Sequence, residues 1–226
     1  RSARSACRYG GGATRSYESN SKMTDIALIG ATGNIGSRVL TEALSRGHAV
    51  TALTRDASKM KPRAGMTVRQ GSTTDAANLA AILAGHAAII VSVKWNEANI
   101  RDVLDAVRRS GVKRALFVVG AGSLLRSDGR THLDHMADRG VQPPTSKPAS
   151  LALAELRKVT DLDWTAISPA ASIRAGERTG EFRLGGDDLL EDEEGQSQIS
   201  YEDFAIAIVD EIEKPRHLRR RFTAAY

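Results

Sequence analysis

The chain has 226 residues, of which 41% are hydrophobic, so it can form one domain with a substantial core or two small ones, and we expect one. The formal net charge is +5, but residues 1–22 alone carry +4, so the nearly neutral remainder gives no indication of nucleic-acid binding. No apolar run approaches the roughly 18 residues that a membrane span needs, which argues against a membrane protein.

Residues 1–22 are rich in Arg, Ser and Gly and poor in apolar side chains. We expect a non-native or disordered tail, either a cloning remnant or an out-of-frame leader, with a mitochondrial-type transit segment as the alternative. The single cysteine of the chain, Cys7, lies there, which excludes an internal disulfide and cysteine-based catalysis. The domain is expected to span residues 23–226 and the protein to be cytoplasmic.

Beyond this tail, strand-like and helix-like patterns alternate along the chain. Strands are expected at 25–29, 48–55, 66–71, 87–93, 113–122, 163–169 and 220–225. Helices are expected at 37–47, 75–85, 97–111, 149–159 and 201–214, with an irregular stretch from 170 to about 198. Strands 87–93 and 113–122 are apolar almost throughout, as strands buried on both faces should be. This order predicts an α/β fold: one Rossmann-like domain with a doubly wound parallel sheet.

The stretch "GATGNIG" at residues 30–36 stands between the first strand and the first helix. In a doubly wound sheet this turn is where a dinucleotide diphosphate binds, because the N–H groups and dipole of the helix point at it. Gly30 would allow the tight turn, Gly33 the close approach of phosphate, and Gly36 the packing of helix on strand. The spacing G-x-x-G-x-x-G differs from the common G-x-G-x-x-G, and a turn without a ligand is the alternative.

The stretch "ALIGATGNIGSRVLTEALSRGHAVTALTRD" resembles the opening of the atypical short-chain dehydrogenase/reductases, in particular their NAD(P)-binding, NmrA-like and flavin-reductase-like group. The likeness continues through "VKRALFVVGAGSL", "LDWTAISPA" and "ISYEDFAIAIVDEIEKP" to the end of the chain. The resemblance implies that Thr32, Asn34 and Ile35 line the diphosphate. It also implies further cofactor contacts: the ribose near Val91, Ser92 and Val93, the nicotinamide near Pro169, and the adenine near Ser72, where relatives often have aspartate.

Arg55 follows the second strand in "LTRD", where a carboxylate would indicate NAD and an arginine indicates NADP. We therefore predict NADP(H), with Lys59 and Lys61 within reach of the 2′-phosphate. Asp56 keeps NAD open, because a shift of one residue would exchange the two roles, and a solvated surface arginine is the other alternative.

Short-chain enzymes of the better-known type activate a substrate oxygen with a tyrosine and a lysine four residues later. None of the four tyrosines has that lysine, and no tyrosine occurs between Tyr17 and Tyr201. The candidate catalytic residue is Ser123 in "GAGSL", near where flavin-reductase-like relatives carry a serine; a loop-forming serine is the alternative, and Gly122 could equally stand at that position.

Two further groups carry weaker signals. His132 and His135 could share one helical face as a proton donor or a metal pair, although solvated loop histidines are the plainer interpretation. The acidic run at 187–195 is expected to be a solvated hairpin turn and the "RHLRRR" cluster at 216–221 a charged edge, so no metal site is predicted.

The combined interpretation is an NADPH-dependent reductase of a planar acceptor, such as a flavin or a quinone, that works without a Tyr-Lys proton relay. The alternative is a non-catalytic NADP(H)-binding redox sensor that regulates a protein partner. An epimerase or dehydratase fits least, because the tyrosine is missing. We expect the small-molecule substrate to contact residues 121–148 and 170–198.

Overall fold

The computed structural model describes residues 23–226, so the predictions for residues 1–22 lie outside the described range. The strands are β1 (Asp25–Ile29), β2 (Ala49–Thr54), β3 (Met66–Gln70), β4 (Ala88–Val91), β5 (Arg114–Val118), β6 (Asp163–Pro169), β7 (Ser172–Arg174), β8 (Arg183–Gly185), β9 (Gln198–Ser200) and β10 (Arg220–Ala225). The helices are α1 (Asn34–Ser45), α2 (Ala76–Leu83), α3 (Ile100–Ser110), α4 (His132–Asp138), α5 (Ser146–Leu156) and α6 (Tyr201–Glu213), with short 3₁₀ turns η1 (Ala57–Lys59) and η2 (Ala121–Ser123).

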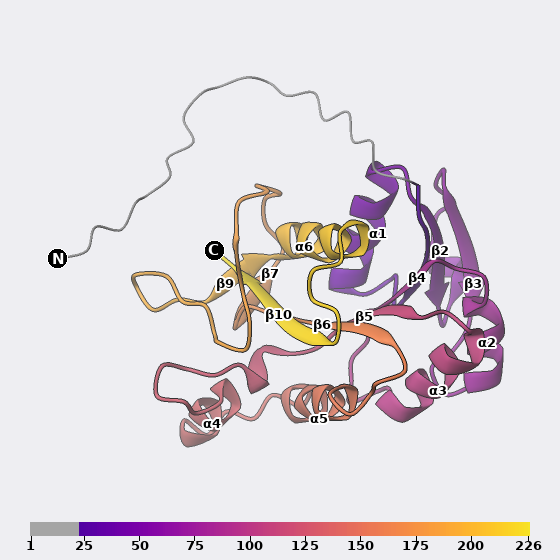
Figure 1. Ribbon diagram of the computed structural model, residues 1–226. Helices are drawn as coiled ribbons and strands as arrows, with labels where there is room; N and C mark the ends of the chain where they lie inside the picture. Colours follow the sequence, from indigo (N-terminus) through magenta and orange to yellow (C-terminus); the bar gives the residue numbers. More distant parts are fainter. Residues whose placement is uncertain (1–22) are drawn as a thin grey trace.

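One eight-stranded sheet carries the fold, in the order β3-β2-β1-β4-β5-β6-β10-β8 (Figure 1). Its first seven strands are parallel, and β8 closes one edge by pairing antiparallel with β10. The strand order reverses at β1, where the chain turns back to build the second half of the sheet, and this reversal is the switch point at which α/β sheets bind ligands. The predicted Rossmann-like doubly wound fold is confirmed.

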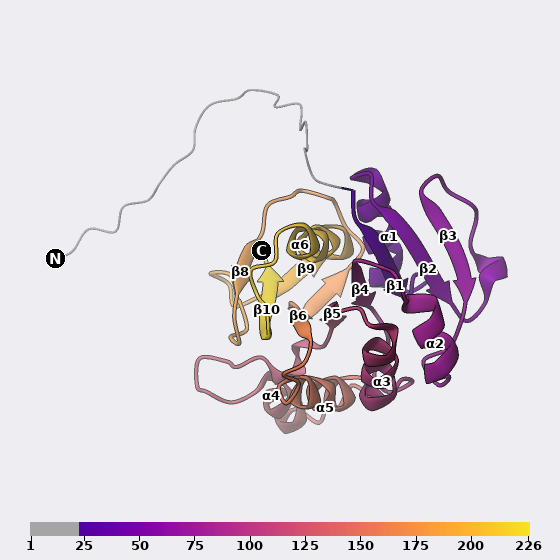
Figure 2. The ribbon, with the colours of Figure 1, turned by 45° about the vertical axis from the view of Figure 1, so that its right-hand side comes forward.

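Helices cover both faces of the sheet, with α1 and α6 on one side and α2, α3 and α5 on the other (Figures 1 and 2). Successive residues of β4 enter opposite cores: Ile89 packs in the cluster with α2, α3 and α5, and Ile90 in the cluster with α1 and α6. Both side chains are fully buried. The continuous apolar pattern of this strand follows from burial on both faces.

The structure corrects the expectation that residues 170–198 are irregular. Strands β7 and β9 form a parallel pair of their own, and β8 extends the main sheet. Each of the three strands has only three residues, so an alternating apolar and polar pattern cannot be recognised in the sequence. Helix α5 also begins earlier than expected, at Ser146, because Pro148 is tolerated in the first helical turn.

Residues 176–180, here called the strap, cross the pair formed by α1 and α6. Asp203 in the first turn of α6 is fully buried, and it accepts hydrogen bonds from the backbone N–H groups of Thr179 and Gly180, both at 2.8 Å. The Thr179 hydroxyl and the Tyr226 phenol also donate to this carboxylate, at 2.6 and 2.8 Å. The strap is therefore held to α6 by the buried carboxylate of Asp203, and also by Glu202, which accepts from the N–H of Gly176 at 2.9 Å.

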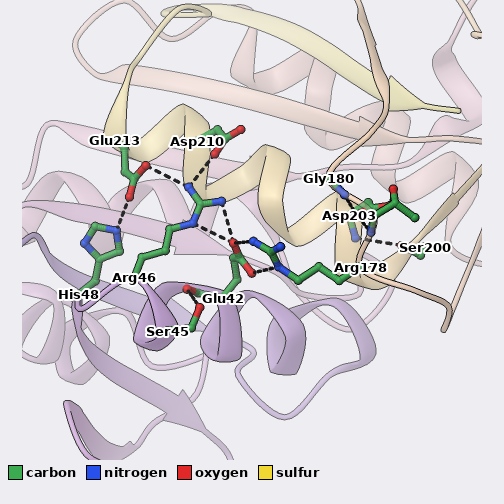
Figure 3. A network of polar contacts seen from close by, with 11 residues as sticks. Glu42, Ser45, Arg46, His48, Arg178, Gly180, Ser200, Asp203, Asp210 and Glu213 are labelled. Carbon is green, nitrogen blue, oxygen red and sulfur yellow. Dashed lines mark hydrogen bonds and ion pairs between the residues drawn. The ribbon is translucent and has the colours of Figure 1, made fainter. Parts of the chain in front are cut away.

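A second buried carboxylate holds the strap to α1 (Figure 3). Glu42 accepts two hydrogen bonds from Arg178 of the strap, both at 2.8 Å, and pairs with Arg46, the C-cap residue of α1. Arg46 reaches on to Asp210 and Glu213 of α6. This network, together with the carboxylate of Asp203, fixes the strap, which continues from the carboxyl end of β6 through β7.

Acid should weaken this anchoring. Burial disfavours the charged form of Glu42, yet the hydrogen bonds from Arg178 and Arg46 outweigh it and hold the pKa of Glu42 below its ordinary value. Asp203 behaves alike: burial opposes its charge, but bonds from Thr179, Gly180 and Tyr226 lower its pKa. Groups whose pKa is lowered on folding stabilise the protein fully above their unfolded values, roughly pH 4.

We therefore expect the free energy of unfolding to fall as the pH drops below about 4. The measurement is urea unfolding between pH 3 and 7, with Asp203→Asn as the comparison. The gap in stability between this variant and the unchanged protein should narrow toward pH 3, because protonation removes the charge that the variant already lacks. A gap that stays constant over the whole range would contradict the assignment.

Candidate functional site

The glycine turn joins β1 to α1 as the sequence predicts. Gly30 has a φ of +86°, and a Cβ there would lie 2.0 Å from the carbonyl oxygen of Ser92. A Cβ on Gly36 would lie 2.1 Å from the carbonyl oxygen of Gly30. Only glycine fits at either position. Gly30 lets the chain turn closely against the end of β4, and Gly36 lets α1 pack closely on the turn.

Gly33 differs from the other two glycines. It is the N-cap of α1 with a φ of −72°, and a Cβ there would meet only the Gly30 carbonyl oxygen, at 3.4 Å. The protein backbone therefore leaves room at this position for a side chain. The absence of one keeps the space in front of the first turn of α1 clear.

The first turn of α1 is open to an anion. No side chain caps this end of the helix, and no acidic residue lies in its first turn. The side chains of Asp75, Asn99, Thr131 and Ser200 cap the N-termini of α2, α3, α4 and α6, whereas α5 lacks a side-chain cap as α1 does. The free N–H groups and positive dipole end of α1 suit a phosphate. Thr32, Gly33 and Asn34 are exposed at this position and Ile35 is half-buried.

The other predicted cofactor residues follow along the same edge of the sheet. Ser92 and Val93 lie directly against Gly30, and the Ser92 N–H donates to the carbonyl of Ile29, at 2.9 Å. Val91 is fully buried in the core, so only its backbone faces this edge. Pro169 is also buried and ends β6, while Ser72 follows β3 and bonds the Thr74 hydroxyl, at 2.8 Å.

Arg55 is placed directly after β2, next to the glycine turn, as predicted. Its side chain is 79% exposed and lies 3.2 Å from Glu97, a residue of the loop after β4. Such an exposed pair contributes less than about 1 kcal/mol, so the guanidinium can leave Glu97 for a stronger anion. No local pattern in the sequence places Glu97 beside the end of β2, so this partner of Arg55 could not be predicted.

Ser123, the candidate catalytic residue, ends η2 just beyond β5, and its hydroxyl accepts a hydrogen bond from Arg221 on β10, at 2.8 Å. The Arg221 side chain is 1% exposed and also pairs with Asp187. The expectation that residues 216–221 form a charged edge is therefore wrong for Arg221, and Asp187 is not simply part of a solvated turn. Burial lowers the pKa of this guanidinium, and Asp187 counters the effect.

The two segments expected to contact the substrate meet in the structure. The Leu125 N–H donates to the Asp187 carbonyl, and the Leu189 N–H donates to the Leu125 carbonyl. Arg126 pairs with Glu191 at 2.7 Å. Residues 121–148 and 170–198 are therefore joined beside the carboxyl ends of β5 and β6.

Both histidines lie on helix α4, so their interpretation as loop histidines is wrong, and the three-residue spacing does belong to a helix. His135 is 2.9 Å from Asp128, whereas the Nδ1 atom of His132 is buried without a partner in the described part of the chain. Burial and the nearby Arg126 lower the pKa of His132, so it is neutral at pH 7. Among residues 23–226 no cluster of three or more His, Cys, Asp or Glu side chains is placed to hold a metal ion.

The chain belongs to the NAD(P)H-binding family, which it matches over residues 30–215. It is 33% identical over 207 residues to the uncharacterized protein YwnB of Bacillus subtilis, covering 88% of this chain and 96% of YwnB. A solved structure from Bacteroides thetaiotaomicron, provisionally named an epimerase, is 38% identical, with a TM-score of 0.83 and coverage of 91% and 98% of the two chains. One from Streptococcus pneumoniae, provisionally named an NADH-flavin reductase, is 30% identical, with a TM-score of 0.76 and coverage of 89% and 99%.

These similarities confirm the family seen in the sequence and make NAD(P)H the cofactor class. The residues present fit a dinucleotide, because the turn admits only glycine at positions 30 and 36 and the first turn of α1 is uncapped. No helix found between residues 23 and 226 has the length and apolar character to cross a bilayer.

Proposed function

We propose that the protein is an NADPH-dependent reductase of a planar acceptor such as a flavin or a quinone. The observation that carries the proposal is a well-formed cofactor turn in a chain without a Tyr-Lys pair. The relative provisionally named an NADH-flavin reductase supports the same kind of acceptor. Epimerase chemistry, suggested by the name of the Bacteroides thetaiotaomicron relative, is less favoured because the tyrosine of the Tyr-Lys pair is absent.

A bound nicotinamide supplies a hydride, and the protein has to bind, orient and shield the reactants. The first turn of α1 would hold the diphosphate, and Arg55 the 2′-phosphate. The joined segments 121–148 and 170–198 would cover the acceptor beside β5 and β6. Since a reduced flavin or quinone can take its proton from water, no protein acid is required.

The test is NADPH oxidation with a panel of flavins and quinones, followed spectroscopically, together with NADPH binding by calorimetry. Turnover with a planar acceptor is the expected result. Tight binding without turnover on any acceptor would instead support the non-catalytic regulator.

Arg55→Ala should weaken NADPH binding by about 10- to 150-fold and leave NADH binding unchanged. A charge-assisted bond to phosphate contributes on the order of 1.5 to 3 kcal/mol, more than the exposed pair with Glu97 that it replaces. Calorimetry with both cofactors measures the difference. Arg109→Ala removes an exposed arginine paired with Asp105 on α3, and this control should change neither affinity. Equal affinities for NADPH and NADH in the unmutated protein would contradict the proposed preference.

Ser123→Ala, His132→Ala and His135→Ala should each lower the turnover number by less than about tenfold, whereas loss of a true general acid costs 10²- to 10⁴-fold. Ser123 can be removed with little damage to the fold, because Arg221 keeps its ion pair with Asp187. Steady-state kinetics with a saturating acceptor provide the measurement. A loss above 100-fold at unchanged NADPH affinity would identify that residue as the proton donor and exclude catalysis by positioning alone.

A further inference from the structure

Tyr201, the first residue of α6, reaches the glycine turn from the far end of the chain. Its phenol oxygen lies 3.3 Å from the Nδ2 atom of Asn34, the first residue of α1. The two residues are 167 positions apart. The N-termini of α1 and α6 therefore meet where the diphosphate would bind.

The direction of this hydrogen bond leaves the phenol proton available. The amide nitrogen of Asn34 can only donate, so the Tyr201 oxygen is the acceptor. In the part of the chain that the structure describes, no group accepts the proton of Tyr201. Tyr226 differs, because its phenol donates to Asp203 and accepts from the N–H of Ser200, at 2.8 and 3.1 Å.

The ring of Tyr201 is held in place by its neighbours. The guanidinium of Arg38 lies over it, 5.4 Å from the ring centroid, and donates to Glu202 at 3.0 Å. The N-terminus of α6 is capped, because the Ser200 hydroxyl accepts a hydrogen bond from the N–H of Asp203. The group of α6 that faces the uncapped N-terminus of α1 is therefore the phenol of Tyr201.

We propose that Tyr201 binds the cofactor diphosphate, its phenol donating a hydrogen bond to a phosphate oxygen held at the first turn of α1. Asn34 keeps the phenol oxygen as the acceptor and so directs the proton toward the ligand. The proposal rests on the cofactor-binding part of the proposed function and not on the identity of the acceptor.

Tyr201→Phe should weaken NADPH and NADH by the same factor, about tenfold, because a bond to a charged group is lost and the diphosphate is common to both cofactors. The melting temperature should not change, since the ring remains under Arg38. Calorimetry with each cofactor gives the affinities. An equal loss distinguishes the diphosphate from the 2′-phosphate, where Arg55→Ala affects NADPH alone.

Tyr226→Phe is the matched control, because it removes a phenol at the same end of α6 that is fully used inside the protein. It should lower the melting temperature and leave both cofactor affinities unchanged. Affinities of Tyr201→Phe within twofold of the unmutated protein would overturn the proposal, as would an equal loss in Tyr226→Phe or a loss for NADPH alone. An unmutated protein that binds neither cofactor would overturn it together with the cofactor assignment. An unmutated protein that binds both cofactors but reduces no acceptor would contradict the proposed reductase function alone. The role of Tyr201 can still be tested on cofactor binding in that case, so failure of the Tyr201 proposal and failure of the reductase proposal are distinguishable.

Discussion

Gly33→Val is expected to reduce NADPH affinity by at least 100-fold in a protein that stays folded. The new side chain would enter the space in front of α1, where the diphosphate needs close contact with the helix N–H groups. Within the protein, the added Cβ meets only the carbonyl oxygen of Gly30, at 3.4 Å. Because glycine is preferred to valine at an N-cap, the free energy of unfolding should fall by about 1 kcal/mol.

Calorimetry with NADPH and thermal unfolding measure the two effects separately. Gly186→Val is the control, since a Cβ at that glycine has nothing within 4 Å. This control should keep the cofactor affinity of the unmutated protein. Retained NADPH binding in Gly33→Val would show that the diphosphate does not bind at this turn.

Substitution of Gly30, in the same turn, should have a different effect from substitution of Gly33. A side chain there combines a φ of +86° with a contact of 2.0 Å to the backbone of Ser92. Gly30→Ala should therefore damage the fold itself, because neither backbone segment can move away cheaply. Gly30 is therefore required for the fold of the turn, whereas Gly33 is required for the space that the ligand would occupy.

Asp203→Ala is expected to lower the free energy of unfolding by about 2 to 4 kcal/mol. The carboxylate is fully buried and accepts four hydrogen bonds, two from backbone N–H groups of the strap and two from hydroxyls. For a domain of about 200 residues this corresponds to a fall in melting temperature of roughly 5 to 15 °C.

Asp210→Ala is the matched control, on the same helix. Asp210 is 56% exposed and bonds Arg46, which keeps Glu42 and Glu213 as partners. Its loss should therefore cost less than about 1 kcal/mol. Denaturant unfolding of the two variants gives the comparison, and equal destabilisation would mean that the strap does not depend on Asp203.

Local patterns in the sequence were sufficient for the seven parallel strands of the main sheet and for the position of the cofactor turn, but not for the short antiparallel strand β8. Strand β6 occupies residues 163–169 as expected, and β4 and β5 lie within the apolar runs that predict them. The order of strands and helices, with "GATGNIG" after the first strand, was enough to predict a Rossmann-like fold. These features are encoded locally because burial on one or two faces imposes a period on neighbouring residues.

The partners of the polar side chains were decided by tertiary structure alone. Arg221 stands in a run of basic residues, yet it is buried against Ser123, a residue 98 positions away. Asp203 meets the strap, and Tyr201 meets Asn34 across 167 positions. No local period records such pairs, since each depends on how the crossovers bring two distant ends of elements to one edge of the sheet. The sequence by itself therefore determined the fold and the cofactor class of this protein, whereas the folded chain decided which polar groups are bound internally and which remain available to a ligand.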